Sequence, residues 1–209
     1  MFEGVLGAEH GALLTVYTDA YVVRGTIATR QRRVTDILNQ AEEGFIVLTD
    51  AVLEEFGHRS HGLTAPFAQI NLSAVLFAVA DTPVEPSPEL RTPKVSQSAL
   101  ISIPPFKVTG MVHLRPERDL RVALGELTGR FLPVTEAAFW SDAVGEPRTT
   151  ATMVAVNHAR AQIVAPYDEA RALREGSAIH GQVEPVAPLR PATVVDGDVL
   201  VTEERKDER

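Results

Sequence analysis

Basic side chains gather in two stretches of this chain that are otherwise poor in acids. Between Val22 and Gln40 four arginines accompany one acid, and between Arg91 and Arg130 seven bases accompany three acids. Clustered guanidinium and ammonium groups bind phosphate oxygens, which is the chemistry of contacts to a nucleic-acid backbone. The basic candidates for such a surface are Arg24, Arg30, Arg32 and Arg33 in the first stretch and Lys107, Arg115, Arg118, Arg121 and Arg130 in the second.

Two interpretations of the first cluster remain open. Arg30, Arg32 and Arg33 precede a predicted helix, where the helix dipole disfavours positive charge, and Asp36 is the only nearby acid. The cluster is therefore either a solvated loop or an edge that contacts phosphates. Asp36 is most simply a capping residue or a partner of the neighbouring arginines.

No catalytic constellation accompanies these bases. The chain has no cysteine, which excludes a thiol nucleophile and thiolate metal sites. His58 and His61 lie close in sequence, but no carboxylate stands at the spacing of a metal ligand. Nucleophile elbows, phosphate-binding glycine loops and zinc-protease helices are also missing from the sequence. We therefore expect neither an enzyme nor a cofactor or metal site.

Three predicted elements surround the first basic cluster. Residues 21–27, YVVRGTI, are typical of a strand, and Gly25 within it indicates a bend or a close approach of another backbone. Residues 34–43 place apolar side chains at helical spacing and end before Gly44. Residues 45–53, FIVLTDAVL, predict a buried strand.

The same pattern returns later in the chain. Phe45 and Phe131 are 86 residues apart, as are Asn71 and Asn157, and 85 residues separate Gly25 from Gly110. A register that persists across loops of different composition indicates an internal duplication. The sequence therefore predicts a mainly β fold with short helices, built as two tandem small β-barrel repeats.

The predicted boundaries follow from this duplication. The first repeat spans residues 12–80, a proline-rich linker 81–98, the second repeat 99–165 and an acidic extension 166–209. Repeats of this size are close to the lower limit for independent folding, so we expect them to pack on one another or on a second chain. Exposed strand edges favour a homo-oligomer, most simply a dimer.

Composition sets further limits. A net charge of −8 argues against a protein that coats nucleic acid through bulk positive charge, so any binding depends on a local basic face. No apolar run approaches 18 residues, and the first residues lack a basic segment before an apolar one. We therefore expect a cytoplasmic protein with no membrane partner.

Several residues match a known motif. Gly25, Asp36 and Asn39 precede Leu48-Thr49-Asp50-Ala51, and the second repeat keeps Gly110 and Val134-Thr135-Glu136-Ala137, with Val122 and Gly125 in place of Asp36 and Asn39. This arrangement resembles the Sm and Sm-like family of bent β-barrels, although the Arg-Gly of that family's second motif is missing near Ile70. Residues 32–39 also resemble the signature Arg-Arg-x-x-Asp-x-Leu-Asn of a group of uncharacterised bacterial proteins. This second resemblance implies no activity.

The resemblance to the Sm-like family implies several properties. It implies binding of single-stranded DNA or RNA, often with chaperone or strand-annealing activity, and ring or dimer assembly through sheet edges. It also implies that Asn39 contacts a base. The alternative is a non-catalytic protein-interaction or regulatory scaffold with an acidic tail. Among the aromatic residues, Tyr21 and Phe106 are the best candidates for base stacking, whereas Tyr17, Phe45, Phe67 and Phe131 are expected in the core.

Overall fold

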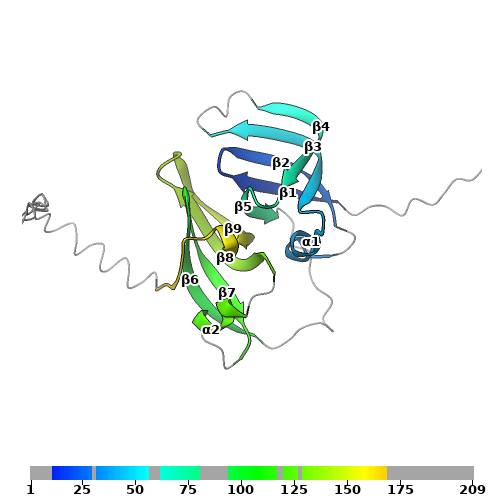
Figure 1. Cartoon of the computed structure of the whole chain (residues 1–209). Coiled ribbons are helices and arrows are strands. Elements are labelled where there is room, and N and C mark those ends of the chain that lie inside the picture. Colours follow the sequence, from blue (N-terminus) through cyan, green and yellow to red (C-terminus); the bar gives the residue numbers. More distant parts are fainter. Residues whose placement is uncertain are drawn as a thin grey trace, which may run out of the picture. The chain divides into compact units, whose positions relative to one another are not determined.

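The computed structural model describes residues 11–29, 32–56, 62–80, 94–116, 120–126 and 129–168 (Figure 1). These residues belong to one compact unit. The strands of the first half are β1 (Gly11–Thr18), β2 (Tyr21–Ala28), β3 (Phe45–Glu55), β4 (Leu63–Asn71) and β5 (Val75–Ala80), with helix α1 (Val34–Gln40) between β2 and β3. Those of the second half are β6 (Val95–Ile103), β7 (Phe106–Leu114), β8 (Phe131–Ser141), β9 (Glu146–Asn157) and β10 (Ile163–Pro166), with helix α2 (Leu120–Gly125) and a 3-10 turn (His158–Arg160).

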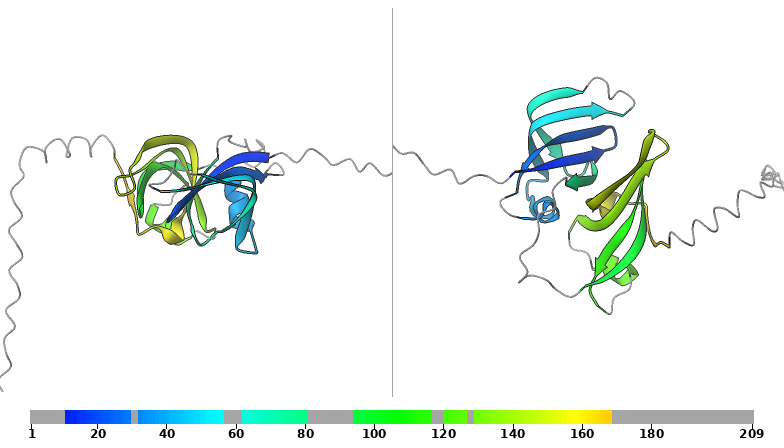
Figure 2. Two further views of the ribbon diagram at one scale, coloured as in Figure 1. Left: turned by 90° about the horizontal axis from the view of Figure 1, so that it is seen from above. Right: turned by 180° about the vertical axis from the view of Figure 1, so that it is seen from behind.

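The mainly β architecture is confirmed, but the two closed barrels are not. All ten strands form one antiparallel sheet in the order β10-β6-β7-β8-β9-β5-β1-β2-β3-β4. A closed first barrel would need β5 to pair with β4. Instead β5 pairs with β9, so the two halves meet along these strands and form one continuous sheet (Figure 2). One edge strand of the first half, β5, therefore pairs with one edge strand of the second half, β9.

Both halves nevertheless have the same internal order. The first half runs β5-β1-β2-β3-β4, and the second runs β10-β6-β7-β8-β9, which is the same order of fifth, first, second, third and fourth strand. Each half also carries its helix between its second and third strands. The 86-residue periodicity of the sequence therefore corresponds to a repeated chain path.

The bend predicted at the strand glycines is present twice. Asp50 in β3 and Glu136 in β8, 86 residues apart, both adopt a positive φ of 49°. At each point the pairing with the preceding strand shifts by one residue, opposite Gly25 and Gly110 respectively. A Cβ on Gly25 would lie 2.8 Å from the carbonyl oxygen of Thr49, so only glycine lets the bulged backbone approach.

Element boundaries differ modestly from the sequence expectations. Helix α1 ends at Gln40 rather than near Glu43, and β6 begins at Val95, inside the predicted linker 81–98. The sequence also predicts strands at residues 12–18, 67–71 and 75–80, with a polar loop at 56–66 before the second of them. β1 and β5 confirm the first and the last, whereas β4 begins at Leu63, inside the predicted loop. Residues 57–61 and 81–93, the extension beyond Asp168 and the hairpin expected at Asp196-Gly197 lie outside the described residues.

The apolar core crosses the junction between the halves. Tyr17 and Phe77 of the first half pack with Phe106 and Phe139 of the second, with ring centroids 4.5 to 5.5 Å apart. Phe106 is only 1% exposed, so the expectation that it stacks on bases is wrong. Phe106 packs in the core because it starts β7 and its ring meets residues of the other half, which no local pattern shows. Each half thus completes the other's core, as expected for units of this size.

Candidate functional site

Asn39 fastens the first half to the second. Its side chain extends from α1 to the start of β8, where Oδ1 accepts from the backbone N–H of Phe131 at 2.7 Å and Nδ2 donates to the Phe131 carbonyl at 2.9 Å. A Cβ on Gly129 would lie 2.7 Å from Nδ2 of Asn39, so the preceding backbone lies close against the same amide. The residue that the resemblance assigns to base contact is therefore engaged with protein backbone.

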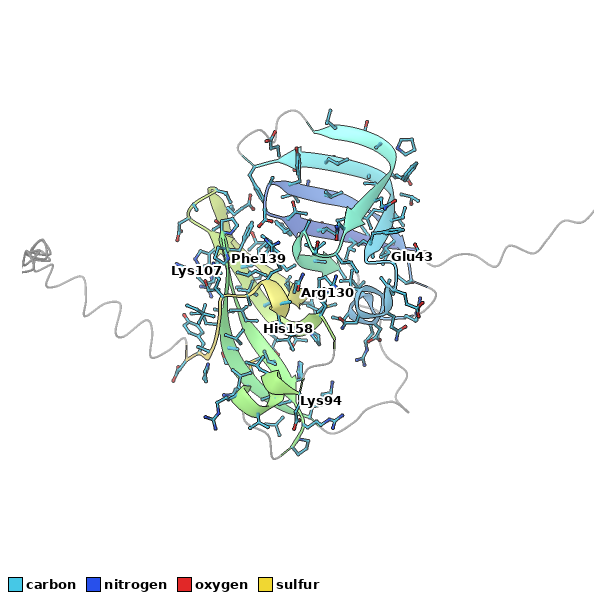
Figure 3. All side chains as sticks on the ribbon, viewed as in Figure 1. Glu43, Lys94, Lys107, Arg130, Phe139 and His158 are labelled. Carbon is cyan, nitrogen blue, oxygen red and sulfur yellow. The ribbon has the colours of Figure 1, made fainter. Side chains whose placement is uncertain are left out.

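His158 also holds this segment. Its Nε2 lies 2.7 Å from the carbonyl oxygen of Gly129 and donates to it, since a carbonyl can only accept. Its backbone N–H donates to the carbonyl of Arg130 at 3.1 Å. The backbone on both sides of Arg130 is thus fixed, while the Arg130 side chain is exposed (Figure 3).

Three surface depressions meet at Asn39. One also contains Arg32, a second contains Arg130 and His158, and the largest, of about 670 Å³, contains Lys94, His113 and Arg115 beside α2 and β8. We call these three depressions, which share Asn39 in their lining, the Asn39 groove. Its basic side chains are Arg32, Lys94, Arg115 and Arg130, and two acids, Glu42 and Glu126, also line it.

Ion pairs separate the basic residues into two groups. The guanidinium of Arg24 lies 2.8 Å from a carboxylate oxygen of Glu54. The guanidinium of Arg160 pairs with Asp19 and donates to the carbonyl of Ser73. Both guanidiniums are therefore engaged in contacts within the protein. Arg32 donates to the neutral amide of Gln40. Within the described ranges no carboxylate forms an ion pair with Lys94, Arg115 or Arg130. The same holds for Arg33 and Arg121, but Lys94, Arg115 and Arg130 line the groove, so their positive charges are available to an anionic ligand there.

The structure brings only part of the predicted basic face together. Arg32 of the first cluster and Arg115 and Arg130 of the second line the groove, although they come from different halves. Lys107 stands at the far end of β7 from Arg115, up to roughly 26 Å away along an extended strand. Of the other candidates, Arg33 occupies the N-cap position of α1, but its side chain makes no capping hydrogen bond. Arg121 lies exposed on α2 and does not line the groove, and Arg30 and Arg118 lie outside the described residues.

Sequence reasoning missed three groove residues. Lys94 lies within the predicted linker, and His113 and His158 are isolated histidines in the sequence. One signal was present for His158, because it directly follows Asn157, the second-half equivalent of Asn71. His113 bridges Ser96 and Thr135 through its two ring nitrogens, at 3.1 and 2.7 Å.

Known proteins give no guide to this groove. Neither protein-family models, nor curated proteins, nor solved structures match the chain. Across the described residues, no three or more His, Asp or Glu side chains are grouped so that they could hold a metal ion. No helix in the same part of the chain has the length and apolarity to span a membrane. His58 and His61 lie outside the described residues.

We expect the substitution Asn39→Ala to loosen the junction between the halves. The change removes two hydrogen bonds to Phe131, each contributing about 1 kcal/mol, so the free energy of unfolding should fall by about 1–2 kcal/mol. Exchange of the Phe131 amide proton should accelerate more than that of amides in β7. Asp36→Ala, on an exposed position of the same helix, serves as the control and should leave that amide protected. Equal exchange in both variants would contradict the role of Asn39.

Proposed function

We propose that this chain is a non-catalytic nucleic-acid-binding protein and that a single strand of DNA or RNA lies along the Asn39 groove. One observation carries the proposal: basic side chains from both halves line one groove, and three of them, Lys94, Arg115 and Arg130, form no ion pair with a described carboxylate. Local potential rather than total charge governs phosphate contacts, so the net charge of −8 is compatible with binding there. The resemblance of Gly25 and residues 48–51 to the Sm-like motif supports the same conclusion.

The groove favours a single strand over a duplex. A flexible single strand can follow the three depressions, the largest of about 670 Å³. A duplex is stiff, with a persistence length of about 150 base pairs, and cannot bend its phosphates into depressions of this size.

The groove also favours backbone contacts over contacts to bases. Phe131 is the only Phe, Tyr or Trp among the described residues that line it, and Phe131 is buried. The rings of His113 and His158, which also line it, are hydrogen-bonded to protein groups. Stacking on exposed aromatics is the usual way in which single-strand binders hold bases. The resemblance assigns base contact to Asn39, but the side-chain amide of Asn39 is hydrogen-bonded to the backbone of Phe131. We therefore expect binding that depends little on base sequence.

The test is the binding of labelled single strands by fluorescence anisotropy. Arg115→Glu and Arg130→Glu should each weaken binding about tenfold or more, and the double variant should lower the dependence of log K on log salt by about 1.4, or 0.7 for each lost phosphate contact. Thermal stability should change little, because an exposed charge contributes on the order of 0–1 kcal/mol.

Lys107→Glu is the matched control. It makes the same change in net charge at an exposed residue that does not line the groove, so it should bind as the parent does. Equal losses in all three single variants would show that bulk charge, not the groove, attracts the strand. Unchanged binding by the double variant would overturn the proposal.

The second candidate function is a protein-interaction scaffold. It is favoured by β4, an outer strand of the sheet on which Leu63 and Phe67 are 70% and 63% exposed. The expectation that Phe67 lies in the core is wrong, because β4 has only one neighbouring strand, β3, among the described residues. If the groove variants and the parent all fail to bind DNA or RNA single strands, this function replaces the first.

A further inference from the structure

The junction between the two halves is built from two different strand edges. The first half contributes its fifth strand, β5, and the second contributes its fourth, β9. Their antiparallel pairing matches Phe77 with Val156, Ala78 with Ala155 and Val79 with Val154. Because the halves share one strand order, each half also has the edge that the other half used in this junction.

These two remaining edges are the outer strands of the sheet. They are β4, the fourth strand of the first half, and β10, the fifth strand of the second half, and each has one neighbour among the described residues. The register of β10 reproduces that of β5. Phe77 of β5 pairs with Tyr17 of β1, and Ile163 of β10 pairs with Ser102 of β6. Ile163 lies 86 residues after Phe77, and Ser102 lies 85 residues after Tyr17, so the two pairs are equivalent.

We propose that copies of this chain associate head to tail, with β4 of one copy pairing with β10 of the next in the register of the internal junction. Transferring the internal pairs by 86 residues matches Ile70 with Ile163, Gln69 with Val164 and Ala68 with Ala165. The proposal concerns the sheet edges and does not depend on the function of the Asn39 groove.

Exposed apolar side chains support a protein partner at these edges. Ile163 is 57% exposed, whereas its equivalent Phe77 is fully buried at the internal junction. Besides the rings that pack on it, Phe77 has Val156 of β9 beside it, and a second strand laid against β10 would place Ile70 beside Ile163 in the same register. Unpaired edges also present free backbone donors and acceptors, and a strand of matching register satisfies them.

Asn71 offers a polar contact of the same kind. Its equivalent Asn157 donates from Nδ2 to the carbonyls of Leu72 and Val75 across the internal junction. Asn71 uses Oδ1 to accept from Ser73. Its Nδ2 has no acceptor among the described residues. In the proposed register it faces the carbonyls that correspond by 86 residues, those of His158 and Ala161 in the next copy.

The junction between copies lacks two other contacts of the internal one. The second-half equivalent of Asn39 is Gly125, and the first-half equivalent of Arg160 is Ala74, neither of which can make the corresponding hydrogen bonds. Association should therefore be weaker than the internal junction and should depend on concentration. Head-to-tail contacts close into a ring if the rotation per copy divides a full turn, and otherwise they extend as a filament.

Engineered cysteines test both the pairing and its polarity, since the full chain has no cysteine of its own. Gln69→Cys mixed with Val164→Cys, and Ala68→Cys mixed with Ala165→Cys, place a thiol opposite a thiol. Close and wide pairs alternate in an antiparallel ladder, so one of these two neighbouring pairs is of the close kind, within reach of a disulfide. Under mild oxidation at least one mixture should give a cross-linked dimer. Thr64→Cys mixed with Val164→Cys, out of register, should give none.

Each outcome decides the proposal. Cross-linking of the Gln69→Cys or Ala68→Cys chain with itself would show edge pairing about a two-fold axis and would overturn the head-to-tail arrangement. Absence of cross-links in both mixtures would overturn it too. In sedimentation of the full chain, Ile163→Lys should shift the protein towards the single chain. The control Val95→Lys, at a similarly exposed apolar residue on the part of β6 that β10 does not cover, should sediment as the parent does.

Discussion

The substitution Asn157→Asp should lower the free energy of unfolding by on the order of 3 kcal/mol at neutral pH. The Asn157 side chain is 1% exposed, and its Nδ2 donates to the carbonyls of Leu72 and Val75 at 3.2 and 2.9 Å. In a carboxylate of the same shape, an oxygen would replace Nδ2 and face both carbonyl oxygens without a proton between them, and the negative charge would be buried away from water. The effect should appear in denaturant unfolding as a lower midpoint with an unchanged slope.

The same variant should become sensitive to pH. Burial without a donor raises the pKa of the new carboxyl group above its unfolded value of about 3.9. When protonated, the group donates one hydrogen bond and leaves one oxygen unpaired, as Oδ1 of Asn157 already is among the described residues. Relative to the parent, the variant is therefore least destabilised below pH 4, and the difference in stability grows as the pH rises from there through the raised folded pKa.

Asn71→Asp is the matched control, because Asn71 is the equivalent residue of the first half. It is exposed, and its Oδ1 accepts from the backbone N–H and the hydroxyl of Ser73, a role that a carboxylate oxygen also fills. This variant should stay within about 0.5 kcal/mol of the parent. A similar loss in both variants, or an Asn157→Asp protein whose difference in stability from the parent does not grow with rising pH, would contradict the structural role of Asn157.

Gly110→Ala should destabilise the second half of the sheet by about 3 kcal/mol. A Cβ at this position would lie 2.6 Å from Cγ1 of Val134 and 2.7 Å from the carbonyl oxygen of Thr135. The second of these is backbone of β8 at its bulge, so relief of the clash requires a shift of the strand rather than a new side-chain rotamer. Thermal unfolding followed by circular dichroism should show the loss directly.

Gly125→Ala provides the comparison for this change. Gly125 ends α2, and no atom lies within 4 Å of a Cβ built there. The extra methyl group should therefore be neutral or should stabilise the protein by up to about 1 kcal/mol, since alanine favours helix over glycine. If Gly110→Ala were as stable as Gly125→Ala, the close approach at the bulge would not constrain the fold.

Features that depend on short stretches of chain could be predicted from the sequence. Strand propensity and helical spacing identified β1, β2, β3, β5, α1 and the last part of β4, because these patterns reflect local backbone preferences. The strand glycines predicted the two bends for the same kind of reason: only glycine leaves room for the bulge at Asp50 and Glu136. The 86-residue register predicted that one strand order occurs twice.

Only the tertiary structure decided which edges meet. Whether β5 closes on β4 or pairs with β9 depends on contacts between residues about 80 positions apart, and both choices satisfy the same local pattern. That choice gave one continuous sheet instead of two barrels. It buried Phe106 against the other half and brought Asn39 to Phe131. It also placed Arg32 with Arg130 while leaving Lys107 at the far end of β7, because packing between halves, rather than spacing along the chain, determines which charges share a surface.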